Sequence, residues 1–201
     1  MMCPSYRQLR SRPNVLCALL LLVAGLCSPQ AANAADDVWP LLKKPGHIVL
    51  LRHSNAPGSV PESNDMNFKD CSIQRNLDAE GRAQAGRIGD AFRKHGIRQV
   101  RLLSSRYCRA LDTAKLTKLG PVKEAPVLNQ VVLSQPVEMR EAGVKGLQLL
   151  KTVPTRQLTM LVSHVTNIQA IAGVSLSSGE MAVVHFDKSG ALVVDGRIAV
   201  P

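Results

Sequence analysis

The chain has 201 residues and a formal net charge of +10, from 25 basic and 15 acidic side chains. Hydrophobic residues make up 45% of it, which is enough for a substantial core and argues against an intrinsically disordered chain. Aromatic residues make up only 3%, which argues against a single-strand nucleic-acid platform, because such platforms stack bases on rings. The charge itself points at first to an anionic partner.

The first 34 residues have the layout of a secretory signal peptide. Three arginines come first, the apolar run VLCALLLLVAGL follows at 15–26, and A-N-A at 32–34 offers a cleavage site. The run is short for a bilayer span, which needs roughly 20 apolar residues, although an uncleaved anchor is the alternative. We therefore expect a domain at 35–201 that is periplasmic or secreted, with no stable membrane anchor after cleavage.

Cleavage after Ala34 changes both the charge and the cysteine content. It leaves 167 of the 201 residues and removes three arginines and no acidic residue, so +10 becomes +7. It also leaves two of the five cysteines, Cys71 and Cys108. An even pair in an exported protein permits one disulfide, and two buried free thiols are the alternative. The sequence has no zinc-ligand spacing, so we expect no structural metal.

Short apolar runs predict the strands, and helical patterns alternate with them. Strands are expected at 47–51, 100–103 and 158–162, and a hairpin is expected from 181–184 and 191–194. Asp78 is placed to cap a helix that Gly96 ends. Helices are also expected in 107–118 and 168–172, whereas two glycines leave 136–156 ambiguous. This alternation predicts a three-layer α/β/α sandwich with a mostly parallel central sheet.

Each of the three apolar strands ends in a polar or basic cluster. The first ends at Arg52-His53, the second at the segment 104–109, and the third at Ser163-His164. Ligands of open α/β sheets bind beyond the carboxyl ends of the strands, so two histidines and several arginines should converge. Arginine matches phosphate oxygens with its planar fork, and a neutral imidazole can attack phosphorus and be released by water. The combination indicates chemistry on a phosphoryl group.

Five segments, in this order, carry a family resemblance. They are LLRHSNAPG at 50–58, NLDAEGRAQAGRIGDAF at 76–92, LLSSRYCRALDTA at 102–114, LVSHVTNIQAIAG at 161–173 and SLSSGEMAVVHF at 175–186. Together they resemble branch 1 of the histidine phosphatase superfamily, over about residues 47–198, which implies a phosphoglycerate-mutase-like fold. With the export signal and the cysteine pair, the resemblance suggests the exported members, including periplasmic phosphatases that act on lipopolysaccharide-core sugar phosphates.

The resemblance implies roles for individual residues. His53 would be the nucleophile that becomes phosphohistidine, and Arg52 beside it would bind phosphate. Arg109 would be the second arginine of the phosphate pocket, and His164 would complete that pocket and stabilise the transferring group. Asn55 stands where family members often add a hydrogen bond to phosphate. No metal or cofactor is implied.

Two positions depart from the family pattern. Ser54 replaces the glycine after the signature histidine, which is a minor change. Gln130, or Asn129, stands where a family glutamate would protonate the leaving group, and an amide cannot do so. General acid help is worth roughly 10²–10⁴-fold. Three explanations stay open: another carboxylate serves, the substrate has a good leaving group such as a phosphoramidate, or the protein binds phosphate without turnover.

Asp70 is the first choice for the missing proton donor, because a Cys71–Cys108 bridge would hold it near Arg109; the alternative is a turn cap. The other carboxylates that could border the pocket are Glu62, Asp65, Glu138 and Glu141.

Two further arginines, Arg75 and Arg106, are expected on the surface or in ion pairs rather than at the site. Glu180 stands at a family position, where it would orient a neighbouring residue or face solvent. Three other histidines match no motif: His47, His95 and His185.

The sequence therefore predicts an exported phosphatase that hydrolyses phosphate monoesters through a phosphohistidine on His53. The alternative is a family member that binds a phosphate ligand with weak or no turnover. The expected partner is a phosphorylated small molecule or a sugar or lipid phosphate, not nucleic acid. A cytoplasmic phosphohistidine phosphatase fits the missing glutamate but not the export signal, and the substrate and oligomeric state stay open.

Overall fold

The computed structural model describes residues 38–60, 67–131 and 136–201, which belong to the unit Ala32–Pro201. The expected signal peptide at 1–34 lies outside the described residues. Within the segments that the structure describes, no helix is long and apolar enough to cross a membrane.

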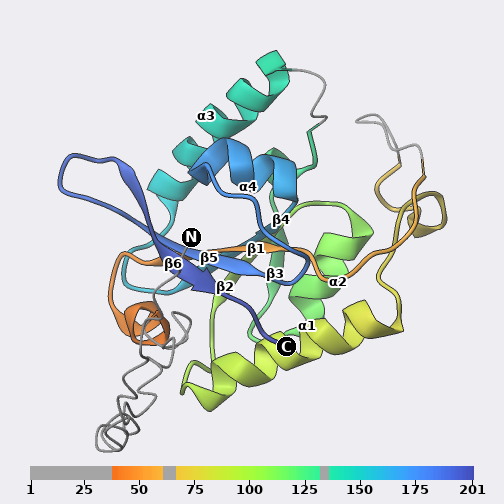
Figure 1. Cartoon of the computed structure of the whole chain (residues 1–201), viewed down its shortest axis with the longest axis horizontal. Helices are drawn as coiled ribbons and strands as arrows, with labels where there is room; N and C mark the ends of the chain where they lie inside the picture. Colours follow the sequence, from red (N-terminus) through yellow and green to blue (C-terminus); the bar gives the residue numbers. More distant parts are fainter. Residues whose placement is uncertain (1–37, 61–66, 132–135) are drawn as a thin grey trace, which may run out of the picture. The chain divides into compact units, whose positions relative to one another are not determined.

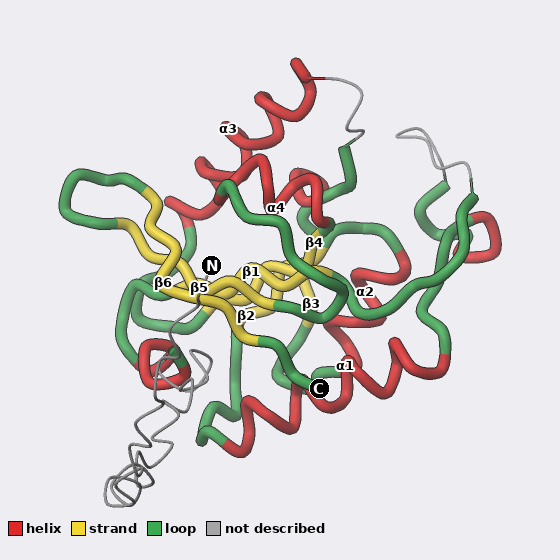
Figure 2. The backbone as a smooth tube through the Cα atoms, in the orientation of Figure 1, coloured by secondary structure: helices red, strands yellow, loops and turns green. Residues whose placement is uncertain are grey.

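A six-stranded mixed sheet runs through the centre of this unit, with strand order β3-β2-β4-β1-β5-β6 (Figures 1 and 2). The strands are β1 (Ile48–Arg52), β2 (Arg101–Ser104), β3 (Val122–Glu124), β4 (Thr159–Ser163), β5 (Met181–Phe186) and β6 (Leu192–Ile198). β1 to β4 run parallel, β5 is antiparallel to β1, and β6 pairs antiparallel with β5. The sheet confirms the α/β class and the predicted hairpin.

Helices cover both faces of the sheet, as the three-layer prediction requires (Figure 1). They are α1 (Ala79–Lys94) and α2 (Cys108–Leu116) on one face, and α3 (Pro136–Thr152) and α4 (Val165–Ala172) on the other. Short 3₁₀ turns connect them: η1 (Trp39–Lys43), η2 (Cys71–Ile73) and η3 (Pro126–Leu128). The cap of α1 is as predicted, because the side chain of Asp78 accepts a hydrogen bond from the backbone N–H of Gly81 at 2.6 Å.

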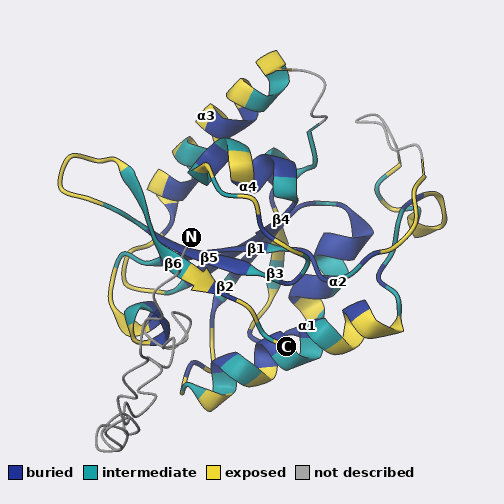
Figure 3. Ribbon diagram, in the orientation of Figure 1, coloured by how far each residue is buried: buried dark blue, intermediate teal, exposed yellow. Residues whose placement is uncertain are grey.

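Two hydrophobic cores follow from the alternation of side chains along the strands. Val49 and Leu51 of β1 pack with Ile88 and Phe92 of α1 on one face. The other face packs its own set against α3 and α4: Ile48, Leu50, Leu150, Ile168 and Ile171. The central strands β2, β4, β1 and β5 are accordingly buried between the helices, while β3, β6 and the outer side of α1 are more exposed (Figure 3).

This topology determines where the functional residues gather. β2, β4 and β1 are neighbours and run parallel, so their carboxyl ends lie at the same edge of the sheet. His53 follows β1, Ser105 follows β2 and His164 follows β4. All three are buried at this edge.

Candidate active site

His53, His164 and Arg109 meet at the carboxyl edge of the sheet. The ring centroids of the two histidines lie 5.3 Å apart. Nε of Arg109 lies 3.3 Å from Nε2 of His53, and Nη2 of Arg109 lies 3.4 Å from Nδ1 of His164. The exposed fraction is 2% for His53, 1% for His164 and 0% for Arg109. Three residues that the sequence assigns to the site are therefore in mutual contact.

The surroundings of His53 favour a neutral ring with a free lone pair on Nε2. Nδ1 lies 2.8 Å from the carbonyl oxygen of Ser54. A carbonyl oxygen only accepts, so Nδ1 carries the proton and Nε2 keeps its lone pair. Burial lowers the pKa of His53 to about 3, and the positive charges of Arg109, Arg52 and Arg75 act in the same direction. The imidazole is thus uncharged at neutral pH.

His164 is oriented by hydrogen bonds on both ring nitrogens. Its Nδ1 faces the guanidinium of Arg109, which only donates, so Nε2 carries the proton and donates it to Oγ of Ser105 at 2.8 Å. Oγ of Ser105 donates in turn to Oδ1 of Asn129 at 3.4 Å. Burial lowers the pKa of His164 well below its ordinary value, and His53 and Arg109 add to this shift.

Arg109, and not Arg106, is the arginine that reaches the two histidines. Its guanidinium lies 4.5 Å from the ring centroid of Tyr107 and donates from Nη2 to Oε1 of Gln130 at 2.6 Å. Arg106 instead stacks its guanidinium over the ring of Phe68, at 4.2 Å from the centroid. The position of Arg109 agrees with the role that the family resemblance implies.

Arg52 and Arg75 add two positive charges close to this cluster. Arg52 donates from Nη1 to the carbonyl oxygen of Leu176 at 2.8 Å, while its buried Nε has no hydrogen-bond partner among the described residues. Burial lowers the pKa of Arg52, and the charges of Arg75 and Arg109 lower it further. Arg75 donates to the carbonyl oxygen of Ala56 at 3.0 Å. Arg75 is half-buried, and its charge lowers the pKa values of His53, His164 and Arg52, whereas the expectation placed it on the surface or in an ion pair.

Asn55 is engaged with α1. Its Nδ2 donates to Oδ2 of Asp78 at 2.9 Å, and its backbone N–H donates to Oε1 of Gln84 at 3.0 Å. Gln84 also donates from Nε2 to the carbonyl oxygen of Ser178 at 2.9 Å, which ties three segments together. In the structure Asn55 therefore holds its own segment against α1. Its hydrogen bond to phosphate stays a prediction.

The amide pair at 129–130 divides into two roles. Oδ1 of Asn129 accepts a hydrogen bond from the backbone N–H of Arg106 at 2.9 Å and so holds the turn after β2. Gln130 is the residue that contacts Arg109. An uncharged amide therefore lies beside the guanidinium, and Gln130 or Asn129 stands where the resemblance implies a glutamate.

The structure favours the turn-cap alternative for Asp70. Its Oδ1 accepts hydrogen bonds from Ser72, at 2.9 Å from the backbone N–H and 2.6 Å from the hydroxyl. These bonds lower the pKa of the exposed Asp70 carboxyl, whereas a general acid needs a raised one. Of the other carboxylates, Glu62 and Asp65 lie outside the described residues, Glu138 lies in the first turn of α3, and Glu141 pairs with Lys145 at 3.0 Å.

Cys71 and Cys108 form the disulfide that their pairing permits, with their Cα atoms 5.8 Å apart. The bond joins η2 to the first residue of α2, immediately before Arg109. Gln74 supports the same junction, because its Oε1 accepts a hydrogen bond from the backbone N–H of Cys108 at 3.0 Å. The segment that carries Arg75 is thereby tied to the helix that carries Arg109.

Thr113 and Glu180 position the site from outside it. Oγ1 of Thr113 accepts from the backbone N–H of Ser54 at 2.9 Å and donates to the carbonyl oxygen of Arg109 at 2.7 Å. Glu180 accepts from the backbone N–H of Ser177 at 2.7 Å, which is the orienting role considered for it. Sequence reasoning gave no role to Thr113 or Ser105, although both stand in the segment that resembles the family.

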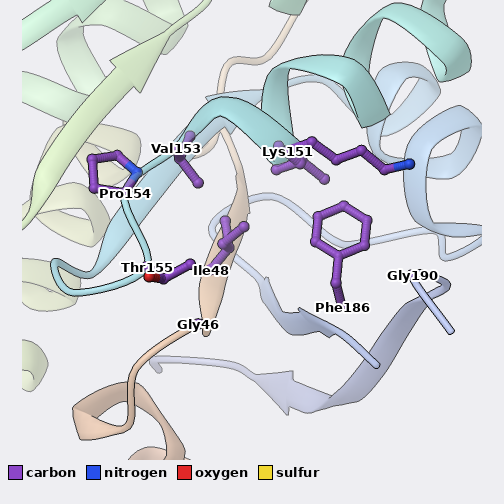
Figure 4. Close-up of a pocket in the computed structure, with 9 residues that line it drawn as sticks. Gly46, Ile48, Lys151, Val153, Pro154, Thr155, Phe186 and Gly190 are labelled. Carbon is purple, nitrogen blue, oxygen red and sulfur yellow. The ribbon is translucent and has the colours of Figure 1, made fainter. Parts of the chain in front are cut away.

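A cavity of about 350 Å³ lies away from this cluster (Figure 4). None of the residues proposed for the site line it, since its walls come from Gly46, Ile48, Leu150, Lys151, Val153, Pro154, Thr155, Phe186 and Gly190. Ile48 lies at the amino end of β1, whereas His53 follows its carboxyl end. The cavity therefore belongs to the opposite edge of the sheet.

Comparisons with known proteins agree with the geometry. Residues 48–133 match the model of the histidine phosphatase superfamily (branch 1). No curated protein matches the chain in sequence. The match covers the segment that carries His53 and Arg109, whereas His164 lies beyond it.

Solved structures share the fold at low sequence identity. The protein histidine phosphatase SixA, complexed with tungstate, is 16% identical, with a TM-score of 0.53 over 76% of this chain and 96% of that one. A mycobacterial glucosyl-3-phosphoglycerate phosphatase in complex with VO3 is 16% identical, with a TM-score of 0.55 over 75% and 97%. A phosphoserine phosphatase mutant from Entamoeba histolytica is 12% identical, with a TM-score of 0.55 over 77% and 96%.

Proposed function

We propose that this protein is an exported phosphatase that hydrolyses phosphate monoesters through a phosphohistidine on His53. The observation that carries the proposal is the buried, neutral His53, whose Nε2 lies 3.3 Å from the guanidinium of Arg109. A lone pair on nitrogen beside a fixed positive charge is suited to attack on a phosphoryl group that the same charge holds. The names of the structural neighbours, which include phosphatases of phosphoserine and of a sugar phosphate, support the substrate class.

The reaction would proceed in two displacements at phosphorus. In the first, Nε2 of His53 attacks, an N–P bond forms, and the P–O bond to the leaving group breaks. The bond from Nδ1–H to the carbonyl oxygen of Ser54 stabilises the positive ring that results. In the second, water attacks the phosphohistidine, inorganic phosphate leaves, and neutral His53 is restored.

The charges around His53 match what phosphoryl transfer needs. Its transition state spreads negative charge over the equatorial oxygens, so catalysis depends mainly on positioning and electrostatic stabilisation. Arg109 is fully buried and Arg52 is half-buried, and burial lets an arginine bond an oxyanion more strongly than it does in water. The unpartnered Nε of Arg52 is a further donor that a bound phosphate would satisfy.

Gln130 restricts the substrates that this site can use well. Its amide has no acidic proton for an alkoxide, so alkyl phosphates would be slow by roughly 10²–10⁴-fold relative to a site with an acid. The leaving groups of aryl phosphates and phosphoramidates depart more easily and need less protonation by a general acid. We therefore propose that the natural substrate has a good leaving group or carries an acidic group that protonates the leaving group.

Turnover of an aryl phosphate by the purified protein, beside His53→Ala, tests the activity. The wild-type protein should release phosphate, the variant should lose at least about 10³-fold in rate, and rapid quenching with ³²P-labelled substrate should trap label on wild type only. Equal turnover by His53→Ala would refute the mechanism.

A second candidate function, phosphate binding with little turnover, is favoured by one observation: the residue that accepts the hydrogen bond of Arg109 is an amide, Gln130, and not a carboxylic acid. Calorimetric titration with vanadate and with phosphate separates the two. Tight binding without turnover of aryl or alkyl phosphates would select the binding function, whereas turnover of aryl phosphate selects the phosphatase.

The proposal of export rests on the layout of residues 1–34 and on the Cys71–Cys108 disulfide, a bond that persists in oxidising compartments. Expression of the full chain in a bacterial host, followed by osmotic shock and amino-terminal sequencing, tests it. A periplasmic product that begins at Ala35 is expected. A cytoplasmic product that retains Met1 would overturn the proposal.

A further inference from the structure

A second cluster of ligand-type side chains lies at the opposite edge of the sheet from His53. It consists of His47, His185 and Asp195, whose ligand atoms all lie within 4.8 Å of one another. His47 directly precedes β1 and His53 directly follows it, so the two sites are separated by about 20 Å along the strand, at about 3.3 Å per residue.

The sheet itself brings the two histidines together. Ile48 of β1 pairs with Val184 of β5, so His47 and His185 stand opposite each other one residue further along the antiparallel ladder. Their ring centroids are 5.4 Å apart. Figure 4 shows Ile48 and Phe186 at the cavity, and side chains alternate along a strand, so the two histidines face the other side of the sheet.

A β-bulge places the third residue of the cluster. In the β5–β6 ladder Val183 pairs with Gly196, while its neighbour Val184 pairs with Val194, so Asp195 is the extra, unpaired residue. Bulges of this kind re-aim a side chain. Here the carboxylate lies with Oδ2 at 2.9 Å from Nδ1 of His185 and at 3.7 Å from Nε2 of His47.

These separations suit a small tetrahedral cation. Zinc binds imidazole nitrogen and carboxylate oxygen at about 2.0–2.2 Å, which places neighbouring ligand atoms of a tetrahedron about 3.3–3.6 Å apart. The two observed separations, 2.9 and 3.7 Å, bracket that length. The third separation, between the two histidine nitrogens, is at most 4.8 Å, so the imidazoles have to move closer together to bind one ion.

The ring of His47 is already oriented as a metal ligand. Its Nδ1 donates to the carbonyl oxygen of Lys44 at 3.3 Å, so the neutral ring carries its proton there and leaves the lone pair of Nε2 toward Asp195. Metal-bound histidines usually donate their second nitrogen to a carbonyl or carboxylate in this way. A neutral His185 would bind the ion through Nδ1 in the tautomer that carries the ring proton on Nε2.

The cluster is sheltered but open to an arriving ion. The side chains of His47 and Asp195 are 12% and 14% exposed, and that of His185 is 33% exposed. Three protein ligands leave a fourth position for water. Two imidazoles and one carboxylate favour a borderline transition metal over Mg²⁺ or Ca²⁺, which prefer sets made only of oxygen.

We propose that His47, His185 and Asp195 form a binding site for a divalent transition-metal ion of the zinc class, remote from the phosphoryl site. The ion fastens the β5–β6 hairpin to the start of β1 and so stabilises the folded chain by mass action. The site is independent of the proposed phosphatase activity. It goes beyond the expectation drawn from zinc-ligand spacing, because neither the cross-strand contact nor the bulge is visible as a sequence spacing.

Calorimetric titration of the metal-free protein with Zn²⁺ tests the site, together with thermal unfolding in Zn²⁺ and in chelator. His47→Ala and Asp195→Asn remove one ligand each. His53→Ala is the matched control, since it removes a histidine of the other pair, which could also attract zinc. We expect one ion per chain at the new site in wild type and in His53→Ala, a higher melting temperature with Zn²⁺, and at least tenfold weaker binding in both ligand variants.

Several results would overturn the site. One is that Zn²⁺ gives no binding isotherm at micromolar protein. Another is that both His47→Ala and Asp195→Asn bind Zn²⁺ as tightly as wild type. A third is that Zn²⁺ binding disappears only in His53→Ala. If either ligand variant does not fold, as judged by circular dichroism, His185→Gln takes its place. Mg²⁺ titrated in parallel should produce neither heat nor stabilisation, and stabilisation by Mg²⁺ equal to that by Zn²⁺ would also refute the proposal.

Discussion

Arg109 donates a hydrogen bond from Nη2 to the side-chain oxygen of Gln130 at 2.6 Å. An uncharged amide therefore stands beside the buried guanidinium that also contacts His53 and His164. Because the amide carries no charge, the positive charge of Arg109 stays available to a phosphate. Because the amide has no acidic proton, the leaving group must depart without help from this position.

Replacing Gln130 with glutamate should change the preference among leaving groups. In the free protein the new carboxylate would pair with Arg109, and a bound phosphate would take over the guanidinium and raise the pKa of the carboxyl. We expect the ratio of kcat for an alkyl phosphate to kcat for an aryl phosphate to rise by about 10–100-fold. Steady-state kinetics on one substrate of each kind measure this ratio.

The control for that experiment is Gln130→Met, which removes the amide without adding an acid. It should leave the ratio close to that of wild type, whatever it does to the absolute rates. A fall of both rates by the same factor in Gln130→Glu would show that the carboxylate only competes with phosphate for Arg109.

The low pKa of His53 predicts how stability depends on pH. The ordinary pKa of histidine is 6.5 and that of His53 in the folded chain is about 3, so between these values the unfolded chain binds more protons. The free energy of unfolding should therefore fall as the pH drops from 6.5 toward 3, by about 1.4 kcal/mol per pH unit at most from this group. Urea denaturation at pH 7, 5.5 and 4.5 measures the slope.

His53→Asn should flatten that dependence, because asparagine does not titrate. His164→Asn should do so as well, since burial also lowers the pKa of His164. Parallel pH curves for wild type and both variants would contradict the assignment of two neutral histidines in the folded state.

How far the sequence predicts the fold depends on the element. The buried strands β1, β2 and β4 appear as apolar runs, because both of their faces are covered. α3 stayed ambiguous because Gly143 and Gly146 disfavour a helix in isolation. In the structure a Cβ at Gly143 would lie 2.5 Å from the carbonyl oxygen of Ala170, so glycine allows α3 to approach α4 closely.

Some contacts of the candidate site can also be predicted from the sequence, and others cannot. His53 and His164 follow apolar strands, so topology alone brings them to one edge, and the resemblance singles out Arg109. The approach of Arg75 depends on a loop that a disulfide holds, and the meeting of His47 with Asp195 depends on register and a bulge. Such contacts come from tertiary geometry and leave no local pattern in the sequence.

Loss of the disulfide should destabilise the fold more than it impairs chemistry. The bond closes a loop with a sequence separation of 37, for which the loop-entropy relation gives about 4 kcal/mol of stability. The double variant Cys71→Ser/Cys108→Ser should lose about that amount in guanidinium denaturation. It should keep measurable activity at low temperature, because Gln74 still holds the backbone at position 108. Unchanged stability under non-reducing conditions would show that the bond does not form in solution.

Two glycines of α1 provide a matched pair of substitutions. A Cβ at Gly81 would lie 2.0 Å from the carbonyl oxygen of Asn55, whereas a Cβ at Gly86 would meet no atom within 4 Å. Gly86→Ala should therefore stabilise the protein by about 0.5–1 kcal/mol, the difference in helix propensity. Gly81→Ala should cost about 1–3 kcal/mol, because backbone must shift to admit the methyl group.

The backbone movement caused by Gly81→Ala should change the geometry of the candidate active site. The segment from His53 to Asn55 has to move away from α1, which disturbs the bond from Asn55 to Gln84 at 3.0 Å and the placement of His53. We expect kcat on an aryl phosphate to fall about tenfold or more in Gly81→Ala, since misplacement of a reacting group by about 1 Å costs up to about 10²-fold. Gly86→Ala should keep the wild-type rate, and equal activity of the two variants would mean that the contact between α1 and Asn55 does not position the nucleophile.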